Sequence, residues 1–224
     1  MKISISGIRG VYGTDFFPQD VIRFCDGFSK LIKNGKCVIG RDTRTTGEMI
    51  EKLVSATLLE KGIDVQILGV TPTPVVFRKA RELGAGIVIT SSHNPLEWNG
   101  LKFIIEGRGI TEKELEVVKN ERNSNRPKLG KESIGISNYV SDAVKVIGKL
   151  EQEKYVTVDI GGGSAKYVAP ELLKEIGCQV TTINDELGTC TRGPDPTTDE
   201  LTELINKTKQ VGFAFDLDSD RMIL

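Results

Sequence analysis

One short segment places two hydroxyls, an imidazole and an amide directly after an apolar run. Residues 86–89 read Gly-Ile-Val-Ile, and residues 90–95 read Thr-Ser-Ser-His-Asn-Pro. Ligands of open α/β sheets bind beyond the carboxyl ends of strands, so chemistry is expected at this position. Ser92 is a candidate nucleophile, and His93 is a candidate partner that stabilises charge. The alternative is a turn whose Ser and Asn side chains bond their own backbone, because adjacent side chains of an extended segment point apart.

A second segment carries a carboxylate at every other residue. After the apolar run 211–214, residues 215–221 read Phe-Asp-Leu-Asp-Ser-Asp-Arg. On a loop, Asp216, Asp218 and Asp220 can converge on one hard cation, and Mg²⁺ accepts a few carboxylates together with phosphate oxygens. Three neighbouring carboxylates repel one another unless a cation neutralises them. A solvated acidic turn is the alternative, and a calcium loop is disfavoured because the expected Gly and distal Glu do not follow.

A glycine-rich turn and three arginines are weaker indications of phosphate binding. Residues 159–164 read Asp-Ile-Gly-Gly-Gly-Ser before a predicted helix, where a turn either cradles phosphate or simply joins strand to helix. Arg9, Arg41 and Arg44 each follow an apolar segment. Arginine suits phosphate and carboxylate equally, so an ion pair with Asp42 is the alternative for Arg41 and Arg44.

Strands and helices alternate along the chain, which predicts α/β layers around mainly parallel mixed sheets. Hydrophobic spacing and turn residues predict strands over 37–40, 63–68, 86–90, 101–105, 155–160, 178–183 and 211–215, and helices over 18–32, 46–62, 75–83, 111–119, 139–150, 165–176 and 199–209. The polar segment 120–131 contains Pro and Gly and is the expected linker. We therefore expect two three-layer α/β/α domains, at residues 1–130 and 131–224.

Composition excludes several classes of protein. Thirty Lys and Arg against 31 Asp and Glu give a net charge of −1, so no overall charge attracts nucleic acid or an anionic membrane. No apolar run approaches the ~18–20 residues that span a bilayer. Four cysteines without CxxC spacing indicate reduced thiols and a cytoplasmic protein. The single histidine excludes a site built from two or more His ligands within this chain.

Taken together, these segments resemble the α-D-phosphohexomutases, the family of phosphoglucomutase, phosphomannomutase and phosphoglucosamine mutase. Residues 90–95 are similar to the family's phosphoserine loop (T-A/S-S-H-N-P), and residues 216–221 to its metal loop (D-G-D-x-D-R), with Leu217 where Gly is usual. Three further family segments are matched, in family order, by Gly7–Gly10, Gly40–Arg44 and Pro194–Thr197, and Asn99–Lys102 follows the first loop at the family's spacing.

Carried over position by position, the resemblance implies a phosphoryl-transfer site. Ser92 would carry the phosphoryl group, and Mg²⁺ would be held by the Ser92 phosphate and by Asp216, Asp218 and Asp220. The other implied site residues handle charge and protons: Lys102 and His93 beside the transferred group, and Arg9 and Arg221 on its oxygens. Phosphoryl transfer needs mostly positioning and charge neutralisation, which fits this division.

The resemblance also implies a reaction. Phosphoserine would give its phosphoryl group to a hexose phosphate, forming a hexose 1,6-bisphosphate, and would then regain the other phosphate, so that phosphate moves between O1 and O6. Glucose or mannose phosphate is the expected substrate, with glucosamine phosphate as the alternative. The family has four domains, so this chain corresponds to the first two, and we expect little turnover from it without domains III and IV. Two other hypotheses are an actin-like ATPase or phosphatase, suggested by residues 158–164, and a binding fragment without turnover.

Overall fold

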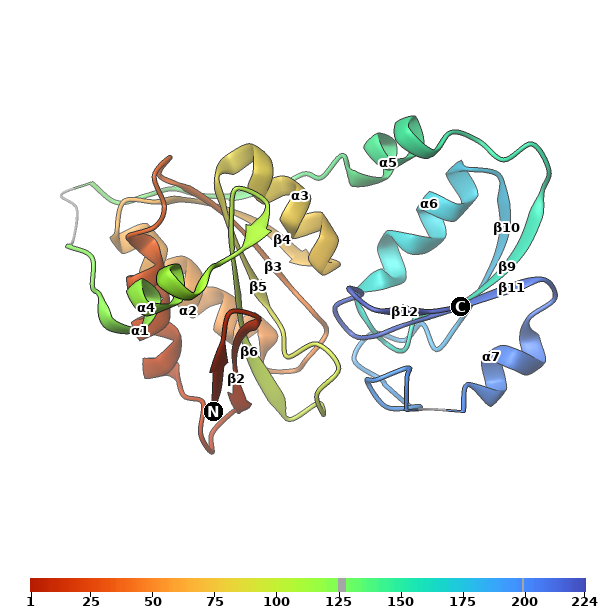
Figure 1. The fold of residues 1–224 in the computed structure, drawn as a ribbon, viewed down its shortest axis with the longest axis horizontal. Helices are drawn as coiled ribbons and strands as arrows, with labels where there is room; N and C mark the ends of the chain where they lie inside the picture. The colour runs from red at the N-terminus through yellow and green to blue at the C-terminus, as the bar shows by residue number, and fades with distance from the viewer. Residues whose placement is uncertain (125–127, 199) are drawn as a thin grey trace.

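The computed structural model describes residues 1–124, 128–198 and 200–224, which form two lobes (Figure 1). The strands are β1 Lys2–Ser4, β2 Gly7–Val11, β3 Lys36–Arg41, β4 Asp64–Val70, β5 Ala85–Ile89, β6 Trp98–Ile105, β7 Arg108–Gly109, β8 Glu132–Ile134, β9 Lys154–Asp159, β10 Cys178–Ile183, β11 Val211–Phe215 and β12 Met222–Ile223. The α-helices are α1 Pro18–Ser29, α2 Gly47–Glu60, α3 Thr73–Leu83, α4 Glu112–Asn120, α5 Tyr139–Ile147, α6 Ala169–Glu175 and α7 Thr202–Lys207, with a 3₁₀ turn, η1, at Ser164–Tyr167. No helix within the described ranges is long and apolar enough to cross a bilayer.

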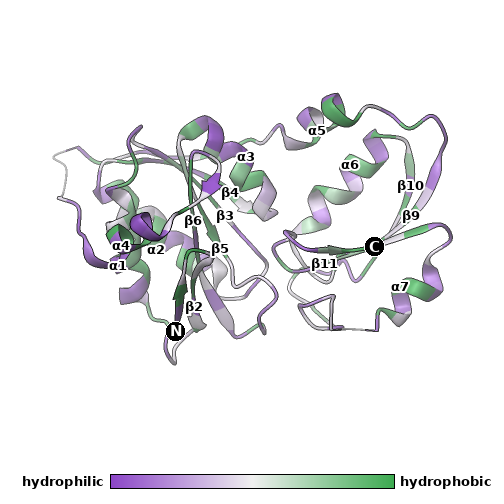
Figure 2. Cartoon of the chain, in the orientation of Figure 1, coloured by the Kyte–Doolittle hydropathy of each residue, from purple (hydrophilic) through white to green (hydrophobic). Residues whose placement is uncertain are grey.

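The first lobe is a three-layer α/β/α sandwich around an eight-stranded mixed sheet. Its strand order is β1-β2-β6-β5-β3-β4-β8, with β7 beside β6. One core lies between the sheet and α1, α2 and α4 and includes Phe24, Phe28 and Phe103. A smaller core lies under α3 and includes Val76 and Ala80. Apolar residues accordingly gather in the central strands, whereas the helices combine hydrophilic and hydrophobic stretches (Figure 2).

The strand direction within this sheet reverses between β5 and β6, which the candidate nucleophile's segment connects. β5 is buried along its whole length and pairs in parallel with β3 but antiparallel with β6. A parallel neighbour needs a crossover of a dozen or more residues, and the loop 90–97 is too short for one. The α/β/α class with mixed sheets is therefore confirmed, while the first sheet is more evenly mixed than expected.

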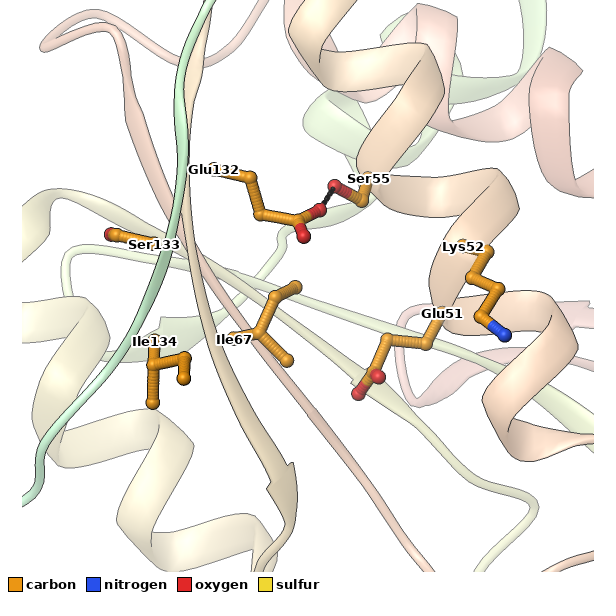
Figure 3. Close-up of a pocket in the computed structure, with 7 residues that line it drawn as sticks. All are labelled: Glu51, Lys52, Ser55, Ile67, Glu132, Ser133 and Ile134. Atoms are coloured by element: carbon orange, nitrogen blue, oxygen red, sulfur yellow. Dashed lines mark hydrogen bonds between the residues drawn. The ribbon is translucent and has the colours of Figure 1, made fainter.

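The strand β8 follows residue 130 and pairs with the sheet of the first lobe. β8 pairs in parallel with β4, and the backbone N–H of Val65 donates to Lys131 O at 2.8 Å. The Ser55 hydroxyl of α2 also donates to the Glu132 carboxylate (Figure 3). Residues 131–134 thus bond to the sheet and helices of the first lobe, and the expected division at 130/131 stays a prediction. Residues 125–127 of the expected linker lie outside the described residues.

The second lobe has a four-stranded sheet in the order β10-β9-β11-β12, parallel except for β12. Its helices α5 and α6 lie on one side and α7 on the other (Figure 1). The expected helix 165–176 is split into η1 and α6, because Pro170 at the start of α6 cannot donate to a preceding turn. The expected helix 139–150 ends at Ile147, before Gly148 at φ 78°. The expected helix 199–209 is observed as α7, and residue 199 lies outside the described residues.

Candidate functional site

The Ser92 loop connects β5 to β6 and lies at the junction of the two lobes. Ser92 is buried and has a φ of 54°, the left-handed region that an L-residue enters at a cost of about 1–2 kcal/mol. Its hydroxyl donates to Asp216 Oδ2 at 2.9 Å and lies 3.3 Å from His93 Nδ1. The contact between adjacent Ser92 and His93 is possible because this turn is not extended.

The acidic loop connects β11 to β12 and brings its three carboxylates together. Ligand oxygens of Asp216, Asp218 and Asp220 all lie within 4.8 Å of one another. Leu217 is buried and its φ is not positive, whereas Ser219 takes the left-handed conformation at φ 59°. A side chain at position 217 therefore fits this loop without backbone strain.

Asp218 is held by two residues of the first lobe. Lys102 Nζ donates to Asp218 Oδ2 at 2.9 Å, and the Thr73 hydroxyl donates to the same oxygen at 2.6 Å. The Thr73 backbone N–H also donates to Asp218 O at 2.8 Å. Lys102 makes a second ion pair, at 2.6 Å, with Asp220 Oδ2. The Asp218 Oδ1 atom is buried without a hydrogen-bond partner among the described residues, so it is free to bind a cation.

The charged side chains of the site shift one another's pKa values. Burial raises the pKa of Asp216, and the carboxylates of Asp218 and Asp220 raise it further. Burial alone would raise the pKa of Asp218, but Lys102 and the Thr73 hydrogen bond lower it below its usual range. Burial opposes the charge of Lys102, yet Asp218 and Asp220 outweigh it and raise its pKa. Asp216 and Asp218 are thus placed to share a proton unless a cation lies between them.

This donor set fits Mg²⁺. Hard cations of this kind take carboxylate oxygens and keep several positions for water or phosphate oxygens. Three converging carboxylates and an orphaned buried oxygen meet that requirement, and Lys102 neutralises only one of the three charges. Asp216, Asp218 and Asp220 would hold the ion, beside the Ser92 hydroxyl.

A hollow of about 560 Å³ opens in front of these loops and is lined by Arg9, Ser92, Lys102, Asp220 and Arg221, among others. Burial lowers the pKa of the Arg9 guanidinium, although arginine keeps its charge in proteins. Burial lowers the pKa of His93 as well, and Arg221 adds to that effect. The hollow therefore joins permanent cationic side chains to an acidic wall, an arrangement suited to an anionic ligand.

The segment 194–197 of the second lobe reaches the same region. Asp195 Oδ2 lies 3.9 Å from Arg221 Nη1, and the Arg221 backbone N–H donates to Asp216 Oδ1 at 3.2 Å. Asp195 also acts on His93 by its charge. All eight residues that the sequence singled out for the site thus lie around the two facing loops: Arg9, Ser92, His93, Lys102, Asp216, Asp218, Asp220 and Arg221.

The glycine-rich turn 159–164 does not form a phosphate cradle. A Cβ on Gly161 would meet the Arg192 guanidinium at 2.4 Å, and one on Gly162 would meet the Thr189 backbone at 2.5 Å. Arg192 is bound to the buried Asp159 at 2.9 Å. The Ser164 backbone N–H donates to Leu217 O at 2.9 Å. Through this bond the turn supports the acidic loop. The close packing of its glycines leaves no space for an actin-like phosphate site.

Another hollow, of about 430 Å³, lies between α2 and β8 on a different part of the first lobe (Figure 3). Its lining includes Glu51, Lys52, Ser55, Ile67 and Glu132. None of these belongs to the Ser92 loop or the acidic loop. The chemistry therefore concentrates at the junction of the lobes.

The comparisons with known proteins agree over both lobes. The model of phosphoglucomutase/phosphomannomutase α/β/α domain I matches residues 1–128, and that of domain II matches residues 137–224. A protein of Methanosphaera stadtmanae, named a probable phosphoglucosamine mutase, is 38% identical over 97% of this chain and 53% of its own length. The phosphoglucosamine mutase of Methanococcus maripaludis (strain C5) is 36% identical over 99% of this chain and 53% of its own length.

A solved structure shows the same architecture. A phosphoglucomutase/phosphomannomutase family protein of Burkholderia thailandensis superposes with a TM-score of 0.82 at 26% identity, over 99% of this chain and 54% of that protein. The chain thus spans about half the length of the curated relatives it matches.

Proposed function

Because the chain belongs to the phosphoglucomutase/phosphomannomutase family, we propose that it carries the phosphoryl group of a hexose-phosphate mutase on Ser92. The observation that carries the proposal is the 2.9 Å hydrogen bond between the Ser92 hydroxyl and Asp216. It joins the candidate nucleophile of one lobe to the carboxylate cluster of the other, within one hollow that also holds Arg9 and Arg221. Because the relatives are about twice as long, the proposal assigns to this chain the half-reaction at Ser92.

The residues divide the work by charge. A phosphoserine carries about −1.5 to −2 charges at neutral pH, and it would face the three carboxylates of the acidic loop. A bound Mg²⁺ would neutralise that charge, held by Asp216, Asp218, Asp220 and a phosphoserine oxygen. Arg9 and Arg221 line the open side of the hollow, where they would bind the phosphoryl oxygens and orient the transfer.

Lys102 would hold a proton beside the transferred group. The two carboxylates bound to its Nζ raise its pKa, so Lys102 is a protonated, charge-stabilising acid while both ion pairs are formed. Lys102 can act as a base for the substrate hydroxyl only once Asp218 and Asp220 bind the cation instead of its Nζ. His93, whose pKa is lowered, would be neutral near pH 7 and would hydrogen-bond the Ser92 oxygen.

The names of the relatives shift the proposed substrate. The sequence favoured glucose or mannose phosphate, with glucosamine phosphate as the alternative. Relatives of 34–38% identity bear the name phosphoglucosamine mutase, so we place glucosamine phosphate first.

A single-turnover experiment tests the proposal. The chain is charged with a hexose 1,6-bisphosphate and Mg²⁺, desalted, and mixed with glucosamine, glucose or mannose 6-phosphate, and loss of the phosphoryl group is followed by intact mass. Glucosamine 6-phosphate should discharge the phosphorylated chain faster than the other two. Faster discharge by glucose or mannose 6-phosphate contradicts the substrate assignment, and failure of every bisphosphate to charge Ser92 contradicts the proposed function. Ser92→Ala is the uncharged control, and Ser91→Ala is the matched control that should charge normally.

A further inference from the structure

Arg44 is a buried arginine whose guanidinium donors all form hydrogen bonds, to backbone carbonyls and to one carboxylate. Its side chain is fully buried, and it follows β3 at the edge of the sheet where the Ser92 loop lies. Arginine has five N–H donors in a fixed planar fork. The guanidinium makes five hydrogen bonds here, one on Nε and two on each terminal nitrogen.

Four of those bonds go to carbonyls of the segment 92–98. Nη2 donates to Ser92 O at 2.7 Å and to Asn94 O at 2.6 Å, and Nη1 donates to Trp98 O at 2.9 Å and to Pro95 O. The accepting carbonyls lie on both sides of His93, so one side chain spans the whole turn. Charge-assisted hydrogen bonds of this kind are stronger than those between neutral groups.

A second set of bonds ties Arg44 to the amide side of Ser92. Arg44 Nε and the Thr90 hydroxyl both donate to Asp42 Oδ2, at 3.0 and 2.7 Å, and the Arg44 backbone N–H donates to Asp42 Oδ1 at 3.0 Å. The Ser92 N–H donates to Thr90 Oγ1 at 2.8 Å. Asp42, Arg44 and Thr90, which we call the Arg44 clamp, therefore hold Ser92 by both its N–H and its C=O.

The clamp explains how Ser92 keeps a conformation that costs energy. A left-handed φ at a non-glycine residue persists only where surrounding bonds outweigh its cost of about 1–2 kcal/mol. Fixing the peptide groups on both sides of Ser92 fixes the direction of its Cα–Cβ bond. That direction places the hydroxyl 2.9 Å from Asp216 across the junction of the lobes.

We propose that Arg44 is a positioning residue for phosphoryl transfer at Ser92, which it aims at the acidic loop by holding the loop carbonyls rather than by touching the phosphoryl group. The inference rests on the function proposed above. A lysine would keep the charge beside Asp42 but has three donors on one atom, and it cannot reach carbonyls on both sides of His93. Arg44→Lys therefore separates charge from geometry.

The matched control lies in the same segment. Arg41 is half-buried, its Nε lies 3.6 Å from Glu51 Oε2, and its hydrogen bond goes to Asp42 O at 3.5 Å. It makes no hydrogen bond or ion pair with the segment 92–98 within the part of the chain that the structure describes. Arg41→Met removes an arginine from this segment without loosening the Ser92 loop.

The test measures the initial rate at which Ser92 gains a phosphoryl group from a hexose 1,6-bisphosphate with Mg²⁺, by intact mass, well below the unfolding temperature of every variant. Misplacement of a reacting atom by about 1 Å costs on the order of 10²-fold in rate. We expect Arg44→Lys to slow the charging of Ser92 by about that factor and to speed amide hydrogen exchange in residues 91–98. Its Mg²⁺ affinity should stay within about threefold of wild type, because Asp218 is held by Thr73 and Lys102 instead. Arg41→Met should charge at the wild-type rate.

The outcomes separate the inference from the function on which it rests. If wild type does not charge Ser92, the proposed function fails. If wild type charges and Arg44→Lys charges equally fast, Arg44 contributes only to stability and the inference is overturned. If Arg44→Lys does not fold, Thr90→Val decides, since it removes only the link between Asp42 and the Ser92 N–H. Slower charging by Thr90→Val, restored by Thr90→Ser, supports the clamp, and charging at the wild-type rate overturns it.

Discussion

Replacing Lys102 with Met should cost stability in a way that depends on the divalent cation. Lys102 has a side chain only 10% exposed and binds Asp218, whose side chain is fully buried. Removing one partner of a buried ion pair costs about 3–5 kcal/mol, because the other charge stays buried without compensation. The second partner, Asp220, is 32% exposed, and an ion pair with that much solvent around it adds at most about 1 kcal/mol.

The expected shift is large enough for a thermal melt. The two losses together amount to about 3–6 kcal/mol, so at about 2–4 °C per kcal/mol for a chain of this size, Lys102→Met should lower the unfolding temperature by about 6–24 °C in EDTA. The loss should shrink in Mg²⁺, because the ion replaces the missing positive charge beside Asp218. Wild type itself should gain about 2.7 kcal/mol at a Mg²⁺ concentration a hundredfold above its Kd, and the variant more.

The control and the refutation use the same instrument. Lys52 forms an exposed helical ion pair with Glu48, so Lys52→Met should leave the free energy of unfolding essentially unchanged in either buffer. If Lys102→Met loses the same stability in EDTA and in Mg²⁺, the cation does not bind at the carboxylates that Lys102 holds. The reading of the acidic loop as a metal site would then be wrong.

Three further predictions concern Thr73, Leu217 and Glu114. Thr73→Val should weaken Mg²⁺ binding measured by calorimetry by about 10–100-fold and Thr73→Ser should not, because the hydroxyl orients Asp218; equal affinities would refute this role. Leu217→Ala should cost about 2–5 kcal/mol in urea unfolding while Mg²⁺ affinity is kept, and a neutral effect on stability would show that this buried side chain does not pack. Glu114 accepts from Arg108 and caps α4, and these bonds lower its pKa to about 2. The stabilisation that Glu114 gives the folded state is therefore complete above its unfolded pKa of about 4.3 and is lost as pH falls through 2. The urea midpoints of wild type and Glu114→Gln should accordingly differ at pH 6 and converge near pH 2. A difference that persists near pH 2 contradicts the assignment.

The sequence predicted the parts of the site that are local. Polar residues directly after apolar strands identified the Ser92 loop and the acidic loop, since strand ends are where α/β proteins place their ligands. The spacing of three carboxylates at alternate residues is likewise a local pattern. The structure brings both loops to one hollow.

The supports of the site could not be predicted, because each joins residues far apart in the sequence. The predicted helix 75–83 left Thr73 outside it and without a role, yet Thr73 begins α3 and holds Asp218 of the other lobe. The sequence left open whether Arg44 binds phosphate or a carboxylate. Its main partners are backbone carbonyls, which have no sequence signal. The hairpin of β1 and β2 and the short strand β8 were missed because each is too short to show periodicity.

The central claim is that Ser92 accepts a phosphoryl group beside a divalent cation. Its most direct test is peptide mapping of the chain after exposure to a hexose 1,6-bisphosphate, in Mg²⁺ and in EDTA. We expect a single phosphate on the peptide containing Ser92, at that residue and not at Ser91. It should form in Mg²⁺ and be strongly reduced in EDTA and in Asp218→Ala. Phosphate on another residue, or equal phosphorylation of Ser92 in EDTA, would contradict it.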